Sequence, residues 1–276
     1  MTWACVIGKP IEHSLSPVLH RAAYEILGLD WEYMRFEVDA EHLPSFMEEL
    51  GSDCVGVSVT MPCKRAVLRQ VDSVESLAKA LGVANTVVIQ GGLRAAFNTD
   101  VRGIQEALRP GLENHPEGRP LIIGNGATAC STLAALATLG YRDISIAARN
   151  FAGIDGAFSI APKLGIAAEA IPLKLSDRVV EVAAGAPIVV STVPSSASGA
   201  LAPNLTPRAD AVFLDVTYSE SVNFLPEAFL RVGALVVSPL SMLVHQGIAQ
   251  VKLMTDLEVP YEPIFEAVQA AARGRK

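Results

Sequence analysis

The stretch from residue 120 to residue 150 constrains the fold of this chain more than any other. The apolar residues 121–123 carry no charge and end directly on a glycine, which is typical of a buried parallel strand. Gly124–Ala129 then reads G-x-G-x-x-A, and residues 130–139 have the composition of a helix. A second apolar run at 144–148 predicts another strand. This strand–turn–helix–strand order is the context in which a glycine-rich turn binds a dinucleotide.

The small residues of this turn each have a physical role in such a site. Gly124 permits a tight exit from the strand, and Gly126 lets main-chain amides approach a pyrophosphate. Ala129 lets the helix pack closely on the strand, and Gly140 is placed to end that helix. The first N–H groups of the helix would bind the negative charge. Glycine-rich turns without a ligand are common, but the flanking strands and helix favour nucleotide binding here.

The residue after the second strand distinguishes between two cofactors. A site for NAD typically has an Asp or Glu at this point, which accepts hydrogen bonds from the ribose hydroxyls. Here residues 146–148 contain no carboxylate, and Arg149 follows at once. Because a guanidinium can bind a 2′-phosphate, the sequence favours NADP over NAD. The alternative is an ordinary solvated arginine in a loop.

The composition indicates a folded protein of two domains. Of 276 residues, 50% are hydrophobic and only 18% are charged, so large apolar cores can form. The 22 basic and 29 acidic residues give a net charge of −7. The only basic run is the short tail at 273–276, which argues against nucleic acid as the main partner.

The cysteines and the hydropathy pattern are typical of a cytoplasmic protein with reduced thiols. Cys5, Cys54, Cys63 and Cys130 have no metal-ligand spacing and form no CxxC pair, so we expect no metal site. No basic segment followed by an apolar core is visible at the N-terminus. The uncharged stretch at 182–207 is interrupted by prolines, which argues against a membrane span. We expect a monomer or homodimer that binds a small molecule, and neither nucleic acid nor a membrane.

Strand and helix patterns also alternate before the glycine-rich turn. We expect strands at 4–8, 31–38 and 54–60, and helices at 17–27, 41–50 and 63–71. Ser16 is expected to cap the first of these helices, with Pro17 at its first position. A hairpin is expected at 82–97, followed by a helix that starts near Gly103. The domain linker is expected in or just before the polar segment 111–118.

Strand patterns recur after the nucleotide turn as well. They lie at 168–171, 188–192, 211–216 and 234–237, and helices are expected at 242–256 and 263–273. The predicted fold class is therefore α/β with two domains. A mixed α/β substrate domain would span 1–105, a Rossmann-like doubly wound nucleotide domain 106–238, and C-terminal helices 239–276.

Three clusters of polar residues follow predicted strands of the first domain, where open sheets place their ligands. They are Ser14 with Ser16, the segment 60–64, and Asn85-Thr86 together with Asn98-Thr99-Asp100. Nearly all are uncharged hydrogen-bonding groups, which suits a small polyhydroxylated ligand with at most one carboxylate. The exceptions are Lys64 and Asp100, a pair that could move a proton. Taken singly, these residues could also be a helix cap, a surface lysine and a satisfied turn.

Several motifs resemble those of one family. Gly8–Pro17 resembles the G-x-P-I-x-H-S-x-S-P opening of shikimate dehydrogenases, and Val59–Lys64 resembles their V-T-x-P-x-K. Asn85-Thr86 and Asn98-Thr99-Asp100 match their N-T and N-T-D motifs, and residues 242–247 resemble their M-L-V-x-Q segment. The nucleotide turn and Arg149 also lie where this family has them. The matches run in order across nearly the whole chain.

The resemblance implies NADPH-dependent reduction of 3-dehydroshikimate to shikimate. It implies that Lys64 and Asp100 form the catalytic pair, and that the C-terminal helices return to the substrate domain. The substrate-binding residues that it implies are Ser14, Ser16, Thr60, Asn85, Tyr218 and Gln246. The NADP-binding residues that it implies are Gly124, Asn125, Gly126, Ala127, Thr128, Arg149, Asn150, Thr192 and Val216. Because the cofactor and Lys64 lie on different domains, we also expect domain closure on substrate.

The chain departs from the family pattern at a few positions. Ser58 replaces the usual Asn, Ala148 and Asn150 flank Arg149 in place of Asn and Thr, and Pro239 and Ser241 replace glycines. A proline stiffens a loop and removes an N–H group, so cofactor placement is less defined than substrate binding. Two alternatives therefore stay open: a quinate/shikimate dehydrogenase that prefers NAD, and a catalytically idle module that senses shikimate or nucleotide.

Overall fold

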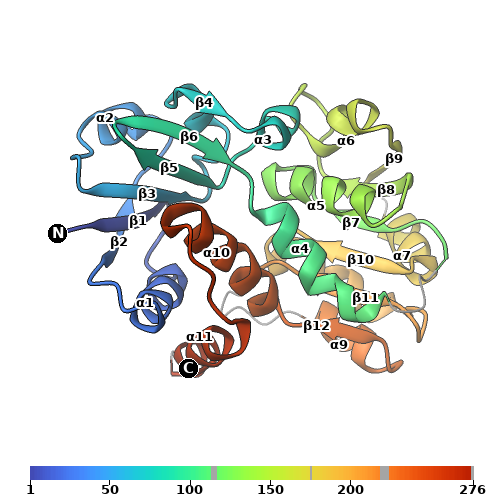
Figure 1. The fold of residues 1–276 in the computed structure, drawn as a ribbon. Helices are drawn as coiled ribbons and strands as arrows, with labels where there is room; N and C mark the ends of the chain where they lie inside the picture. Colours follow the sequence, from blue (N-terminus) through green and yellow to red (C-terminus); the bar gives the residue numbers. More distant parts are fainter. Residues whose placement is uncertain (113–116, 175, 218–223, 275–276) are drawn as a thin grey trace. The chain divides into compact units, whose positions relative to one another are not determined.

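The computed structural model describes residues 1–112, 117–174, 176–217 and 224–274. The chain forms two compact units, whose elements are labelled in Figure 1. The first unit contains Met1–Gly103 and Leu243–Lys276, and the second contains Ile104–Met242. The first unit is thus built from two separate stretches of sequence, with the second unit inserted between them. The linker predicted at 111–118 lies partly outside the described residues.

The first unit contains a mixed sheet of six strands in the order β2-β1-β3-β5-β6-β4. The strands are β1 (Trp3–Gly8), β2 (Glu32–Glu37), β3 (Cys54–Val59), β4 (Ser73–Val74), β5 (Thr86–Gln90) and β6 (Leu93–Phe97). The strand β1 pairs in parallel with β2 and β3, whereas β5 is antiparallel to both β3 and β6. The predicted hairpin and the predicted mixed α/β class are therefore confirmed.

The helices of the first unit are mostly short before the C-terminal stretch. They are α1 (Ser16–Ile26), α2 (Leu43–Glu48), the 3₁₀ turn η1 (Ala66–Arg69) and α3 (Ser76–Leu81), and α4 (Asp100–Leu108) begins in this unit. Both α3 and the strand β4 are additions to the prediction. The helix α3 is capped by the Glu75 carboxylate, which accepts from the Ala78 N–H at 3.1 Å, and it ends at the left-handed Gly82.

The helix predicted at 63–71 is wrong, since only the 3₁₀ turn η1 forms there. An α-helix would need the Lys64 carbonyl to accept from the N–H of residue 68. That carbonyl instead accepts from the Ala84 N–H at 2.9 Å, and the Leu68 N–H donates to Arg65 at 3.3 Å. A contact from distant sequence therefore replaces the local helical bond.

The second unit contains six parallel strands in the order β12-β11-β10-β7-β8-β9. Its strands are β7 (Leu121–Ile123), β8 (Asp143–Ala148), β9 (Ala167–Pro172), β10 (Ile188–Ser191), β11 (Val212–Asp215) and β12 (Leu235–Val237). The α-helices between them are α5 (Ala127–Thr138), α6 (Ala157–Ile160), α7 (Ser176–Gly185), α8 (Ser195–Ser198) and α9 (Leu225–Leu230). Three 3₁₀ turns accompany them: η2 (Arg109–Gly111), η3 (Ala161–Leu164) and η4 (Gly199–Asn204). This order confirms the predicted doubly wound Rossmann-like sheet.

The helix α5 begins earlier than its predicted start at residue 130, with Gly126 as its N-cap. Its C-terminal end is as predicted, because Gly140 takes a positive φ of 101°. The Gly140 N–H donates to Ala137 at 3.1 Å, and the Tyr141 N–H donates to Leu136 at 3.0 Å. These two bonds form a Schellman motif, which satisfies carbonyls at the end of the helix.

The C-terminal helices pack on the first unit, as the family resemblance implied. They are α10 (Pro239–Thr255) and α11 (Tyr261–Arg273), and α11 contacts α1. Glycines allow α10 to approach closely on two sides. A Cβ added at Gly56 of β3 would lie 2.6 Å from Met254, and one at Gly247 would lie 2.4 Å from Leu19 of α1. No helix among the described residues is long and apolar enough to cross a membrane.

Candidate active site

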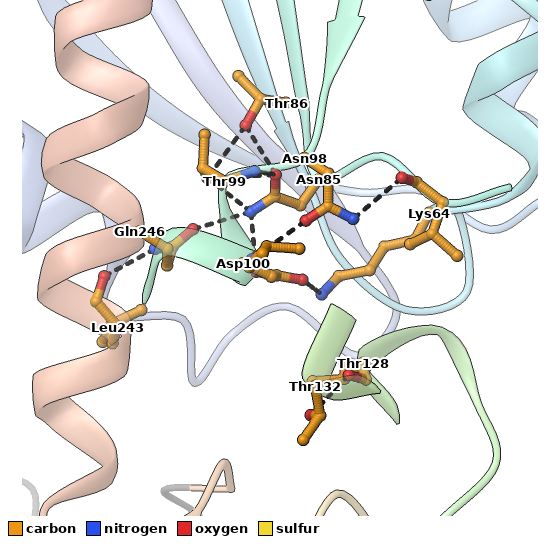
Figure 2. A network of polar contacts seen from close by, with 12 residues as sticks. Lys64, Asn85, Thr86, Asn98, Thr99, Asp100, Thr128, Thr132, Leu243 and Gln246 are labelled. Carbon is orange, nitrogen blue, oxygen red and sulfur yellow. Dashed lines mark hydrogen bonds and ion pairs between the residues drawn. The ribbon is translucent and has the colours of Figure 1, made fainter. Parts of the chain in front are cut away.

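A lysine and an aspartate form a buried ion pair in the first unit. The Lys64 Nζ lies 2.6 Å from the Asp100 Oδ2, and the two side chains are only 12% and 5% exposed (Figure 2). Lys64 lies in the turn that follows β3, and Asp100 is the first residue of α4. Because a buried ion pair loses the hydration of both charges, it needs further hydrogen bonds to be stable.

Asn85 provides one of those bonds and joins the pair to its neighbours. Its Nδ2 donates to the Asp100 Oδ1 at 2.8 Å, to the Thr99 Oγ1 at 2.8 Å and to the Gln246 Oε1 at 3.1 Å (Figure 2). Its Oδ1 accepts from the Thr99 N–H at 2.8 Å and from the Thr86 hydroxyl at 2.9 Å. The amide orientation of Asn85 is thereby fixed, and Asp100 accepts hydrogen bonds through both carboxylate oxygens.

Gln250, one helical turn after Gln246, continues this polar cluster into the core. Its Nε2 donates to the Thr86 Oγ1 and to the Asn85 carbonyl, both at 3.0 Å. Its Oε1 accepts from the Ser58 hydroxyl at 2.7 Å, and Ser58 accepts from the Tyr33 hydroxyl at 2.6 Å. Donors and acceptors therefore follow one direction from Tyr33 through Ser58, Gln250, Thr86 and Asn85 to Asp100.

His20 lies against the same glutamine and is fully buried. Its Nε2 lies 3.2 Å from the Gln250 Oε1, which can only accept, so Nε2 carries the proton. Burial lowers the pKa of His20 to about 3, so the ring is neutral at physiological pH. The ring stacks on Tyr33 with centroids 4.0 Å apart, and burial raises the pKa of Tyr33.

The sequence prediction did not include Gln250, His20 or Tyr33. Gln250 follows Gln246 by four residues, so both face the same side of α10, and that spacing was the available signal. Ser58 was noted only as a departure from the family pattern. In the structure it is the residue that orients the Gln250 amide.

Ser14 and Ser16 are buried at the start of α1. The predicted cap is wrong: Leu15 is the N-cap and Ser16 is the first helical residue. The Ser14 Oγ accepts from the Ser16 N–H at 3.3 Å, so Ser14 provides a side-chain acceptor for the first N–H group of the helix. Asn98 does have the role of a turn residue, since its Oδ1 accepts from the Val101 N–H at 3.3 Å.

Thr60 follows β3 and lies beside the end of β1, because Ile7 and Val59 are paired in these neighbouring strands. A Cβ at Gly8 would lie 2.3 Å from the Thr60 side chain, so Gly8 allows the close approach of the two loops. The hydrogen bonds described above bring together Lys64, Asn85, Asp100 and Gln246. Ser14 and Thr60 lie on the loops after β1 and β3, and Ser16 is the first residue of α1. Tyr218 lies outside the described residues.

The glycine-rich turn of the second unit has the features that a pyrophosphate needs. Gly124 has a φ of +124°, and a Cβ there would lie 2.1 Å from the Thr192 Oγ1. A Cβ at Gly126 would meet only open space, so the start of α5 is accessible. Ala127 and Thr128 open α5, and the first N–H groups of a helix have no carbonyl partner within it. This accessible turn fits a dinucleotide phosphate.

Thr192 and Val216 follow β10 and β11, strands adjacent to one another in the sheet. The Thr192 N–H and hydroxyl donate to the Ile123 carbonyl at 2.8 and 3.0 Å, and the Val216 N–H donates to Ser191 at 3.0 Å. The residues therefore lie at the carboxyl ends of the strands, beside the point where the strand order reverses. That edge is where ligands bind in sheets of this kind.

Arg149 is exposed directly after β8, and no described residue forms a salt bridge with it. The side chains of Asn125 and Asn150 form hydrogen bonds to the main chain of the protein. The Asn125 Nδ2 donates to the Asn150 carbonyl at 3.2 Å, and the Asn150 Oδ1 accepts from the Ala152 N–H at 2.7 Å. An available guanidinium beside the glycine-rich turn fits the 2′-phosphate of NADP.

The sheet order, the accessible turn and the exposed arginine of the second unit define a dinucleotide-binding protein, whose first unit holds a buried Lys–Asp pair. Residues 6–87 match the family model of the shikimate dehydrogenase substrate binding domain. Residues 240–269 match the model of the shikimate 5′-dehydrogenase C-terminal domain. The chain belongs to the shikimate dehydrogenase family.

Individual relatives match this chain over nearly its whole length. Shikimate dehydrogenase (NADP(+)) of Methanopyrus kandleri is 34% identical over 276 residues, which cover 95% of this chain and 93% of that protein. The crystal structure of Mycobacterium tuberculosis shikimate dehydrogenase is 37% identical, with a TM-score of 0.84, and the match covers 98% and 100% of the two chains. Shikimate 5-dehydrogenase from Thermus thermophilus, in complex with NADP(H) and shikimate, is 28% identical with a TM-score of 0.81, covering 98% and 100%.

Proposed function

We propose that this protein catalyses the NADPH-dependent, reversible reduction of 3-dehydroshikimate to shikimate. The observation that carries this function is the buried Lys64–Asp100 pair, joined through Asn85 to Gln246 in a member of the shikimate dehydrogenase family. A lysine held by a carboxylate among neutral hydrogen-bonding groups suits proton transfer to a polyhydroxylated ketone.

The neutral polar residues would bind the substrate. Ser14 and Ser16 lie on the loop and helix start after β1 and would hold the substrate carboxylate. The side chains that would hold the ring hydroxyls are Thr60, Asn85, Asp100 and Gln246, with Tyr218 as a further member outside the described residues. Gln246 supports this role because its Nε2 already donates to the Leu243 carbonyl at 2.7 Å, which fixes the amide group.

Lys64 and Asp100 would carry the proton transfer. Bound NADPH supplies the hydride that reaches the ketone carbon. As negative charge develops on the ketone oxygen, the Lys64 ammonium stabilises it and then donates a proton, so that a hydroxyl forms. Asp100 holds the ammonium in place through its Oδ2 and is itself held by Asn85 through its Oδ1. In the reverse direction, neutral Lys64 accepts the hydroxyl proton as hydride leaves.

Arg149 supports NADP as the cofactor. A guanidinium can make two parallel bonds to a phosphate, and each charge-assisted bond contributes roughly 1.5–3 kcal/mol. Because about 1.4 kcal/mol corresponds to a tenfold change in affinity, we expect roughly ten- to hundredfold preference for NADP over NAD. Arg149→Ala should remove most of this preference and leave kcat/KM with NAD nearly unchanged. Better activity of the wild type with NAD would favour the quinate/shikimate alternative.

A spectrophotometric assay tests the function directly. Purified protein is mixed with shikimate or quinate and with NADP or NAD, and the reduced-nicotinamide band is followed. We expect the band to grow fastest with shikimate and NADP. No growth with any pair would contradict catalysis and leave a sensing module as the remaining explanation.

The proposed function has a matching cellular setting. We infer a cytoplasmic monomer or homodimer that binds its small-molecule substrate and NADP, without nucleic acid or a membrane as partner. Two observations support this setting: the four cysteines are buried thiols that form no disulfide, and the net charge is −7. Size-exclusion chromatography with light scattering would measure the oligomeric state.

A further inference from the structure

We propose that Asn125 is a positioning residue for the part of the cofactor that distinguishes NADP from NAD. It lies between the two glycines of the nucleotide turn, directly before the N-cap of α5. Its role is to hold the loop that carries Arg149. The role presupposes the NADP preference proposed above.

The Asn125 carboxamide joins both ends of the loop that follows β8. Its Nδ2 donates to the Asn150 carbonyl at 3.2 Å, directly after Arg149. Its Oδ1 accepts from the Phe158 N–H at 2.8 Å, at the beginning of α6. In addition, the Asn125 carbonyl accepts from the Ala157 N–H at 3.3 Å. One residue of the glycine-rich turn therefore fixes the entry and the exit of the loop.

Gly156 shows how closely Asn125 fits against this loop. A Cβ added at Gly156 would lie 2.3 Å from the Asn125 Nδ2 and 2.8 Å from its Oδ1. The φ of Gly156 is −76°, a value that other residues adopt readily. The glycine is therefore needed for the contact with Asn125 and not for the backbone conformation.

Other side-chain contacts order the loop internally or join its middle to α5, where the Cys130 Sγ donates to the Asp155 carbonyl at 3.5 Å, but they do not join Asn150 to the nucleotide turn. The Asn150 Oδ1 accepts from the Ala152 N–H at 2.7 Å, and the Ser159 hydroxyl donates to the Gly153 carbonyl at 2.7 Å. The rings of Phe151 and Phe158 are in edge contact at 5.4 Å. Without the Asn125 amide, the loop would keep these bonds and lose its link between Asn150 and the turn.

Together with the bond from the Gly124 N–H to the Ala147 carbonyl at 2.8 Å, this link holds two anion-binding groups near one another. The turn binds the pyrophosphate, which NAD and NADP share, whereas Arg149 faces the phosphate that only NADP carries. If Arg149 is not held, its segment must be ordered when the cofactor binds, and affinity falls by that ordering cost. The cost applies to NADP alone, because NAD has no group for Arg149 to bind.

Titration calorimetry with NADP⁺ and with NAD⁺, on the full chain, measures this effect without reference to activity. In Asn125→Ala the ratio of the affinity for NADP⁺ to the affinity for NAD⁺ should fall about tenfold, which corresponds to about 1.4 kcal/mol. The dissociation constant for NAD⁺ should change by less than about threefold, or roughly 0.7 kcal/mol. Alanine is tolerated at this position because the residue does not have a positive φ.

Two further variants make the test specific. Gly156→Ala should lower the same ratio, because its methyl group displaces the Asn125 side chain. Thr138→Ala removes a comparable hydrogen bond, from its hydroxyl to the Ala134 carbonyl at 3.0 Å, at the far end of α5. That variant should keep the wild-type ratio.

Each outcome is decisive. An unchanged ratio in Asn125→Ala and Gly156→Ala would overturn the positioning role while leaving the NADP preference intact. Equal loss of both cofactors in Asn125→Ala would also overturn it, since that result indicates damage to the pyrophosphate turn. A wild-type protein that binds both cofactors equally would instead contradict the proposed cofactor itself. If Asn125→Ala does not fold, Gly156→Ala decides the question.

Discussion

At the scale of single residues, Lys64 gives the clearest prediction. Lys64→Ala removes the proposed proton donor, so kcat should fall by roughly 10²–10⁴-fold, the usual contribution of a positioned acid or base. The KM for shikimate should change much less, because the Asn85 Nδ2 still donates to the Asp100 Oδ1 and keeps that carboxylate in place. Steady-state kinetics in both directions measure the effect. Lys79→Ala, which removes an exposed lysine on α3, is the control. Near-normal turnover of Lys64→Ala would contradict the role.

The two serines after β1 give a second prediction at this scale. Each hydroxyl bond to a carboxylate contributes roughly 1.5–3 kcal/mol, so the double variant Ser14→Ala, Ser16→Ala should strongly raise the KM for shikimate. An analogue without the carboxylate should react almost as it does with the wild type. Equal loss on both substrates, with a lowered Tm, would instead indicate a defect in α1, since Ser14 accepts from the Ser16 N–H.

At the scale of elements, the helix α10 carries a stability prediction. Gln250→Leu would leave the buried hydroxyls of Ser58 and Thr86 without the amide, at a cost of about 1–3 kcal/mol for each unsatisfied group. The midpoint of urea unfolding should fall, and kcat should fall as well, because the Asn85 carbonyl and the Thr86 hydroxyl beside the ion pair lose their bonds to Gln250. Gln269→Leu on α11, whose side chain accepts from Arg273, is the matched control. Unchanged unfolding and turnover would show that the Gln250 contacts contribute nothing.

The elements also show what local sequence could and could not predict. The apolar runs of the second unit predicted all six parallel strands, because buried parallel strands have a pattern that is visible in isolation. The pairing of Lys64 with Asp100 was predicted through motifs whose residues are far apart in sequence. The helix predicted at 63–71 does not form because the Ala84 N–H occupies the Lys64 carbonyl. The contacts of Gln250 come from residues of β3, β5 and α1. Such contacts exist only in the folded chain.

At the scale of the whole molecule, His20 should make stability depend on pH. Its pKa is about 3 in the folded state and near 6.5 when exposed, so between these values the unfolded chain binds a proton that the folded chain does not. The contribution of neutral, buried His20 to the free energy of unfolding is therefore complete above pH 6.5, and it decreases as the pH is lowered toward 3. The slope from this group approaches about 1.4 kcal/mol per pH unit.

Chemical unfolding of the wild type and of His20→Gln, at several pH values between about 7 and 4, measures this slope, because an exposed histidine gains its proton in this range. We expect the free energy of unfolding of the variant to depend less on pH. The glutamine side chain would fill only part of the space in which the His20 ring stacks on Tyr33. Identical slopes in the two proteins would show that His20 does not couple protonation to folding.

The division of the first unit into two stretches, 1–103 and 243–276, has a consequence for how the protein is made. A ribosome releases the N-terminal stretch first, then the whole nucleotide-binding unit, and only afterwards α10 and α11. Until then, Asn85 has no Gln246 to bind, and Gly56 and Leu19 have no helix above them. The nucleotide-binding unit can therefore fold before the proposed substrate site, which is completed only after residues 243–276 have been synthesised.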